Sequence, residues 1–223
     1  MTAVSDRLWA MSRLASRPLA LSVCTSMVLA ISFAQPSGPG IFAGQSAIGA
    51  AGPGGSAVFD AQKGEYRVTG GGADVWGTSD DFHYVWKKIS GDLTFSADIG
   101  WEGAGAFPRR KAMLMIRQSL DAGSAYVDAA AHGNGLTSLQ FRGKSGEQTY
   151  QILTQIDGPV RVRIVRKGNR YTVFAGKPDG PLTPLGPVEF INLTDPVYIG
   201  LGVCSHLAGT LETAIFTNVT LQQ

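Results

Sequence analysis

Residues 93–101 read LTFSADIGW, a stretch in which every second side chain is apolar. The apolar positions are Leu93, Phe95, Ala97, Ile99 and Trp101. Successive side chains of a β-strand point to opposite faces of a sheet, so a period of two predicts a strand with one buried face. An amphipathic helix would instead repeat its apolar residues every three or four positions. The stretch therefore predicts a half-buried β-strand.

The same alternation continues through the rest of the chain. It recurs at residues 160–164, 171–175, 197–203 and 213–221. Lys167-Gly168-Asn169 predicts a turn that joins the first two of these stretches into a hairpin. Beyond residue 35 we find no helical period and no repeat of fixed length, which argues against a propeller or a solenoid. We expect an all-β fold, namely a two-sheet antiparallel β-sandwich of the jelly-roll type.

Length and composition fit this expectation. The chain has 223 residues, which a single all-β domain often reaches. Hydrophobic residues make up 44% and charged residues 16%, as in globular proteins with a packed core. The 29 glycines and 11 prolines suit many turns between short strands.

The N-terminal residues predict an export signal. Residues 19–34 carry no charge, and Ser32-Phe33-Ala34 places small residues where a signal peptidase cleaves. The basic residues before this run are Arg7, Arg13 and Arg17. An uncleaved anchor helix is the alternative, but the run is short for a bilayer span of about 20 residues. We expect cleavage after Ala34, a secreted or periplasmic protein, and no membrane span after cleavage.

This interpretation divides the chain into three parts. Residues 1–34 form the signal peptide, and residues 35–55 form a lead rich in Gly, Ala and Pro. Within that lead, Gly40-Ile41-Phe42 could begin an edge strand. Residues 56–223 form the β-sandwich.

Removal of the signal peptide changes the charge of the domain. The signal peptide holds three of the 19 basic and one of the 17 acidic residues, so 16 of each remain. A neutral domain has no electrostatic attraction for nucleic acid or for an anionic membrane. Cys204 is then the single cysteine, so an internal disulfide is not expected. We interpret it as a small buried hydrophobic residue, with a reactive thiol as the alternative.

Three segments carry a resemblance to a known superfamily. They are residues 64–95, 110–142 and 197–206, and they include DFHYVWKK at 81–88, KAMLMIRQSLD at 111–121 and HGNG at 132–135. Together they resemble the concanavalin A-like lectin/glucanase superfamily. Within it, the chain looks most like a sandwich domain of bacterial secreted proteins that is attached to some TolB-like (biopolymer-transporter) proteins. The resemblance covers nearly all of residues 40–222 and implies a β-sandwich.

The same resemblance implies a carbohydrate-related role without a single activity. The superfamily includes carbohydrate-binding modules, lectins, glycosidases and many domains without a known role. This chain has no propeller, so the resemblance implies no transport role. It also lacks the strand with two glutamates and an aspartate that marks the β-glucanases of the superfamily.

Three successive predicted strands hold the candidate binding residues. At residues 111–118, 125–132 and 136–142, alternation places one set of side chains on a single sheet face: Arg117, Tyr126, Asp128, His132, Gln140 and Arg142. Guanidinium, carboxylate and amide groups suit the hydroxyl groups of a sugar. The alternative is a solvated face with an ion pair between Arg117 and Asp128.

Aromatic rings that stack on sugars are the next candidates. Trp86 and Trp101 lie in apolar alternations, where tryptophans more often belong to the core. Trp76 lies in the glycine-rich segment 70–77, so we expect it to be the exposed ring.

The sequence predicts no catalytic centre. Hydrolysis of a glycoside needs two carboxyl groups across a cleft, and Asp98 and Asp128 are the two acidic residues that lie in mid-strand. His83, His132 and His206 are scattered, so we expect neither a metal site nor a cofactor. The favoured hypothesis is a non-catalytic domain that binds an extracellular or envelope carbohydrate. Two alternatives stay open: a sugar-active hydrolase or lyase that uses Asp128 with His132 or Arg117, and a structural or protein-interaction domain.

Overall fold

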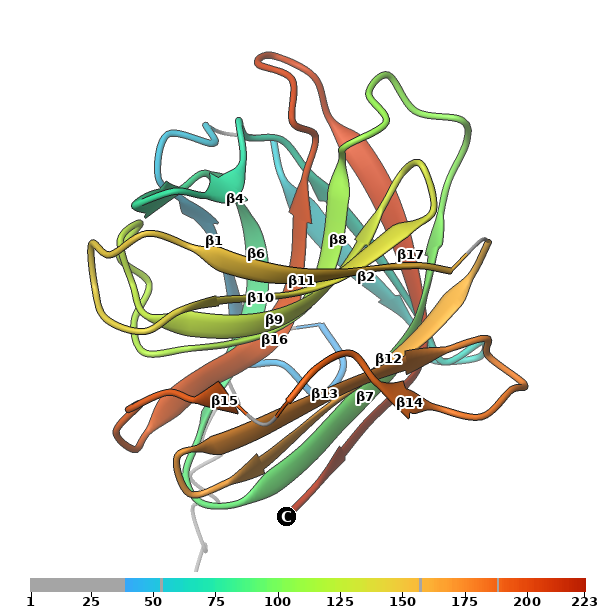
Figure 1. Ribbon diagram of the computed structural model, residues 1–223. Helices are drawn as coiled ribbons and strands as arrows, with labels where there is room; N and C mark the ends of the chain where they lie inside the picture. Colours follow the sequence, from blue (N-terminus) through green and yellow to red (C-terminus); the bar gives the residue numbers. More distant parts are fainter. Residues whose placement is uncertain (1–38, 53, 157, 188) are drawn as a thin grey trace, which may run out of the picture. The chain divides into compact units, whose positions relative to one another are not determined.

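The computed structural model describes residues 39–223 except 53, 157 and 188. The predicted signal peptide, its cleavage site and the start of the lead lie outside the described residues. In the part of the chain that is described, no helix is long and apolar enough to span a membrane. The described residues form two large antiparallel sheets that pack as a β-sandwich (Figure 1), as the sequence predicted.

The first large sheet has seven strands in the order β1-β6-β16-β8-β9-β10-β11. Their bounds are β1 (Gly44–Ile48), β6 (Phe82–Ile89), β16 (Val197–Cys204), β8 (Lys111–Arg117), β9 (Tyr126–His132), β10 (Leu136–Arg142) and β11 (Tyr150–Gln155). Strands β8, β9 and β10 follow one another in sequence and in space, which brings the predicted site residues onto neighbouring strands.

The second large sheet has eight strands in the order β14-β13-β12-β7-β17-β3-β2, with β15 paired to β13. Their bounds are β14 (Thr183–Pro184), β13 (Arg170–Gly176), β12 (Val160–Lys167), β7 (Leu93–Trp101), β17 (Glu212–Gln222), β3 (Glu65–Gly70), β2 (Ser56–Asp60) and β15 (Glu189–Phe190). The stretch LTFSADIGW is β7, and the predicted hairpin is formed by β12 and β13.

The main core lies between the two large sheets. Phe95, Ala97 and Ile99 of β7 point into it from one sheet, while Leu114 and Val127 point into it from the other. The apolar side chains of the alternating stretches thus pack against each other between the two sheets. Burial of apolar surface is the dominant favourable contribution to folding. Cys204 is fully buried, in agreement with its interpretation as a small hydrophobic residue.

The predicted lead contributes to the sandwich. Strand β1 lies within residues 35–55 and pairs with β6 at the edge of the seven-stranded sheet. It begins at Gly44 rather than at residues 40–42, and the side chain of Phe42 packs in the core beside the ring of Phe95.

A short hairpin lies against the outer face of the seven-stranded sheet. It consists of β4 (Val75–Trp76) and β5 (Ser79–Asp80), which pair with each other and with no other strand. The chain reaches it through Gly72, where a Cβ atom would collide with the carbonyl oxygen of Asp81. Val75 packs into a second, smaller core with Phe82 and Met113. We call residues 74–81 the cover.

Candidate functional site

The outer face of β8, β9 and β10 holds the side chains that the sequence predicted to share one surface. Strand register places Arg117, Tyr126 and Arg142 in one row and puts Asp128 beside Gln140 in the next row. All five side chains are fully buried. The predicted face is therefore neither solvated nor open to a ligand at this end, because the cover and its neighbouring loops lie over it.

Asp80 of the cover fixes this closed end through a buried ion cluster. Its Oδ2 atom lies 3.3 Å from Nη2 of Arg117, and its Oδ1 atom accepts a hydrogen bond of 2.7 Å from Nη2 of Arg142. Arg142 also donates to the carbonyl oxygens of Gly77 and Ser124. Arg117 therefore pairs with Asp80, and the ion pair with Asp128 that the sequence suggested does not form. We call Asp80, Arg117 and Arg142 the Asp80 cluster.

Asp128 lies in this buried region without a salt bridge. Neither carboxyl oxygen has a hydrogen-bond partner among the described residues. Burial raises the pKa of Asp128 well above its ordinary value, because a carboxylate loses its hydration in a protein interior. The carboxyl group is therefore neutral over a wide range of pH.

The other end of the outer face contains a pocket of about 230 Å³. It lies between residues 74–76 of the cover and the edge strand β11. We call it the outer-face pocket, and it is lined by Asp74, Trp76, Arg109, Lys111, His132, Leu136, Gln140, Gln151, Leu153 and His206. Of the predicted binding residues, Trp76, His132 and Gln140 reach this pocket, whereas Arg117, Tyr126, Asp128 and Arg142 do not.

Asp74 compensates the charge of Lys111 in the outer-face pocket, whereas the exposed Arg109, which also lines it, forms no salt bridge with a described residue. The ammonium group of Lys111 lies 2.6 Å from Oδ1 of Asp74 and donates to the carbonyl oxygen of Val75 at 2.8 Å. Nε2 of His206 lies 3.0 Å from Oδ2 of Asp74. Both oxygens of the carboxylate are thus occupied, and Lys111 is held 5.5 Å from the centre of the Trp76 ring.

Neutral hydrogen-bonding groups complete the pocket. Gln140 donates from Nε2 to Oε1 of Gln151 at 3.3 Å, while its own Oε1 atom has no partner among the described residues. His132 lies 3.2 Å from the hydroxyl group of Ser138, and burial lowers the pKa of His132 to about 4. The imidazole is therefore neutral at physiological pH.

Trp76 is the exposed aromatic side chain of the pocket, as the sequence predicted. Its exposed fraction is 37%, and it stands on the cover above Lys111. Trp86 and Trp101 pack against the two cores, in agreement with the prediction that they are core residues. The ring of Trp76 can accordingly contact a ligand from one side while the exposed Gln151 contacts it from the sheet.

Several pocket residues were not identified from the sequence. Lys111 lies on the same face of β8 as Arg117, so extending the alternation back to the first residue of this strand would have included it. Gln151 follows from extending the sheet by one strand to β11. Asp74 and His206 come from two separate loops, and no local pattern marks them as neighbours.

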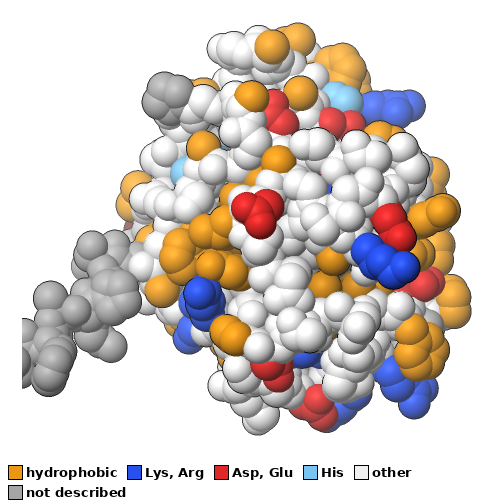
Figure 2. Space-filling view, turned by 90° about the vertical axis from the view of Figure 1, so that its left-hand side faces the viewer, with side chains coloured by type: hydrophobic (Ala, Val, Ile, Leu, Met, Phe, Trp, Pro, Cys, Tyr) orange, Lys and Arg blue, Asp and Glu red, His pale blue; other side chains and the backbone are white. Residues whose placement is uncertain are grey.

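The described residues contain no group of three or more His, Cys, Asp or Glu side chains placed to hold a metal ion. Figure 2 shows one face of the molecule, on which the described acidic and basic side chains are scattered between uncharged ones. That face has no continuous charged patch among the residues described.

Comparison with known proteins gives the fold but no family. No family model matches the chain, and no curated protein sequence is significantly similar to it. A structure of a functionally unknown protein from Saccharomyces cerevisiae has a TM-score of 0.59 at 12% identity, over 75% of this chain and 91% of that one. The resemblance to domains attached to TolB-like proteins stays a prediction.

Two further structures are carbohydrate-related. The carbohydrate-binding module CBM66 from Bacillus subtilis has a TM-score of 0.51 at 15% identity, over 82% of this chain and 98% of that module. A xylan β-1,4-xylosidase from Bacillus halodurans C-125 has a TM-score of 0.53 at 13% identity, over 70% of this chain and 33% of the enzyme. At these identities the similarity establishes a shared β-sandwich fold.

Proposed function

We propose that this chain is a secreted, non-catalytic domain that binds a carbohydrate in the outer-face pocket. One observation carries the proposal: an exposed tryptophan ring lines a pocket together with neutral amide and imidazole groups. Sugars present an apolar ring face and several hydroxyl groups, and this arrangement offers a partner for each. The carbohydrate-binding module among the structural neighbours supports the same proposal.

The charges of the pocket can accommodate either a neutral or an anionic sugar. Asp74 is paired with both Lys111 and His206, so the ammonium group of Lys111 is already compensated. Arg109 also lines the pocket and forms no salt bridge with a described residue, so it can pair with a sugar acid. The exposed amide of Gln151 offers both donors and an acceptor to a hydroxyl group, and the buried amide of Gln140 donates to Gln151.

The carboxyl groups support binding rather than hydrolysis. Asp74 is the single carboxylate among the described residues that line the pocket, and both its oxygens are engaged. Asp128 is fully buried and does not line it. Glycoside hydrolysis uses two carboxyl groups on either side of the scissile bond, and the pocket supplies one.

Affinity electrophoresis of the purified protein through gels that contain neutral or anionic polysaccharides tests this proposal. We expect at least one of these polysaccharides to retard the wild type, and Trp76→Ala and Gln151→Ala to weaken binding at least about tenfold, the equivalent of ~1.4 kcal/mol. Tyr150→Ala is the matched control, because Tyr150 is exposed on the same edge strand and does not line the pocket.

The same assay contains the outcomes that contradict the proposal. Absence of retardation by every polysaccharide, or binding by Trp76→Ala that equals the wild type, rules out this site. Release of reducing ends from a bound polysaccharide rules out a non-catalytic role. Export is tested separately by N-terminal sequencing of the secreted protein, for which we expect Gln35 as the first residue.

A further inference from the structure

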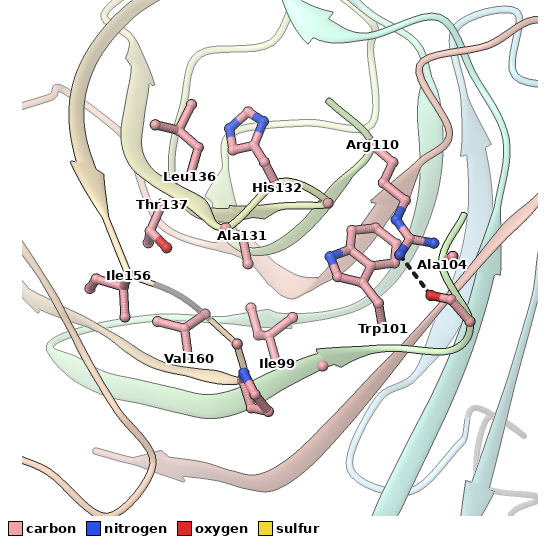
Figure 3. A pocket seen from close by; sticks show the side chains of 16 residues that line it. Ile99, Trp101, Ala104, Arg110, Ala131, His132, Leu136, Thr137, Ile156 and Val160 are labelled. Carbon is pink, nitrogen blue, oxygen red and sulfur yellow. Dashed lines mark hydrogen bonds between the residues drawn. The ribbon is translucent and has the colours of Figure 1, made fainter. Parts of the chain in front are cut away.

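A second pocket of about 350 Å³ opens between the two large sheets (Figure 3). Its apolar walls come from both sheets: Ile99 of β7 and Val160 of β12 on one side, and Ala131 of β9 on the other. Its mouth lies at two exposed loop segments, 103–104 and 158–159. We call it the inter-sheet pocket.

Four buried polar atoms of the lining residues have no partner among the described residues: Arg110 Nε, His132 Nδ1, Thr137 Oγ1 and Trp101 Nε1. The side chain of Thr137 is 1% exposed, and its hydroxyl group makes no hydrogen bond with any described residue. The indole Nε1 atom of Trp101 is likewise buried without a partner in the described part of the chain. Figure 3 shows the hydroxyl group of Thr137 and the indole Nε1 atom of Trp101 directed from opposite sides toward the space above Ala131. A buried donor left unsatisfied costs about 1–3 kcal/mol, so most such groups in proteins have a partner.

The size of the pocket indicates a partner larger than one water molecule. A water molecule occupies about 30 Å³ in the liquid, so the pocket has room for several times that volume. Small-molecule sites typically begin near ~300 Å³ and combine apolar walls with a few placed polar groups. The inter-sheet pocket has both features.

The wall near the mouth carries a charge that is already compensated. The guanidinium group of Arg110 stacks on the ring of Trp101 at 4.2 Å from its centre. Its Nη1 atom lies 2.5 Å from Oε2 of Glu212, and its Nη2 atom donates to the carbonyl oxygen of Gly103 at 2.9 Å. These contacts hold the indole in place and leave no free cation to attract an anionic ligand.

We propose that the inter-sheet pocket binds a small neutral ligand with an apolar ring or short chain and an acceptor oxygen. The indole of Trp101 can only donate a hydrogen bond, so the ligand must accept there, and the hydroxyl group of Thr137 can donate to the second lone pair of the same oxygen. This site is separate from the outer-face pocket, and only His132 and Leu136 line both. It therefore does not depend on carbohydrate binding.

The indole N–H resonances of ¹⁵N-labelled protein test the proposal. Cyclohexanone serves as the neutral probe with an acceptor oxygen, and cyclohexanecarboxylate and cyclohexylammonium serve as charged probes of the same ring size. We expect cyclohexanone to shift the Trp101 signal saturably at millimolar concentration, while the signals of Trp76 and Trp86 stay in place. Neither charged probe should shift Trp101 to a comparable extent.

Thr137→Val gives the matched variant, because valine keeps the shape of threonine and lacks its hydroxyl group. Removing an unpartnered buried hydroxyl group should not lower stability, so the variant stays folded. We expect it to weaken cyclohexanone binding about fivefold, the effect of one hydrogen bond of ~1 kcal/mol. An unmoved Trp101 signal, equal shifts with all three probes, or unchanged affinity in Thr137→Val would each overturn the proposal.

Discussion

The two ends of the outer face of β8, β9 and β10 share the same strands and the same alternation, yet they have opposite environments. At one end Arg117 and Arg142 are sealed under the cover and pair with Asp80. At the other end Lys111 and His132 border a pocket. The strand side chains are buried at both ends, and the ends differ in the pocket that residues 74 and 76 and the edge strand β11 form at one of them. Polar side chains at the closed end hold the fold together, while those at the open end can meet a ligand.

The largest effect expected from this comparison is the loss of Asp80. Its carboxylate is the single acidic partner of two fully buried guanidinium groups among the described residues. Asp80→Ala leaves both without a counter-charge, and breaking a buried ion pair in this way typically costs about 3–5 kcal/mol. We expect a loss of that size in the free energy of unfolding, measured by urea denaturation.

Glu147→Ala is the control for this experiment. Glu147 forms an exposed ion pair with Lys144 at 3.7 Å, and exposed pairs contribute little to stability. We expect a change within ~0.5 kcal/mol. If Asp80→Ala were as stable as Glu147→Ala, the closed end would not be a structural cluster.

The next effect is the pH dependence of stability, to which Asp128 at the closed end and His132 at the open end contribute with opposite sign. Burial raises the pKa of Asp128 well above its usual value, so the folded state keeps a proton that the unfolded state releases above pH ~4. Its contribution to stability is lost as the pH rises. Burial lowers the pKa of His132 to about 4, from about 6.5 when unfolded. Its contribution is lost as the pH falls from about 6.5 to 4.

As the pH rises from 4 to 6.5 in the wild type, Asp128 lowers the free energy of unfolding while His132 raises it. Relative to the wild type, Asp128→Asn should make stability rise more steeply with pH in this window, by up to ~1.4 kcal/mol per unit. His132→Gln should change the slope in the opposite direction. Urea denaturation at several pH values measures both, and slope changes of the same sign in the two variants would contradict these environments.

The smallest effect expected is a slow labelling reaction at Cys204, which lies opposite Lys111 at the open end of the face and is nevertheless fully buried. Cys204 belongs to the small core beneath the cover, and burial raises the pKa of its thiol to about 12. The thiolate is the reactive form, so native protein with Cys24→Ser should react with a thiol reagent far more slowly than denatured protein. Labelling of the native protein at the denatured rate would show that the small core beneath the cover is accessible to solvent.

The sequence predicts the strands of this molecule better than their surroundings. LTFSADIGW specified β7, and the alternation at 111–142 assigned side chains to the correct faces, because both follow from the backbone geometry of a strand. The same alternation says nothing about what lies above a face. Residues 70–77 contain several glycines and read as a loop, so the hairpin that buries Arg117 and Arg142 was not anticipated.

Only part of the candidate site was predictable from the sequence. Trp76, His132 and Gln140 were identified, because one stands in an exposed loop and two lie on the predicted face. Asp74 and His206 meet only through the topology of the sheet, over a separation of more than a hundred residues. Contacts of this kind leave no mark on a local pattern.

The most direct test of the central claim compares one variant from each end of the outer face. Isothermal titration calorimetry with the polysaccharide that retards the wild type gives the affinity of Trp76→Ala at the open end and of Tyr126→Phe at the closed end. Tyr126→Phe removes only a hydroxyl group that lies 3.1 Å from that of Thr149. We expect Trp76→Ala to lose at least about tenfold in affinity and Tyr126→Phe to bind within about twofold of the wild type. Normal binding by Trp76→Ala, or an equal loss in a folded Tyr126→Phe, would contradict the division of this face into a structural end and a binding end.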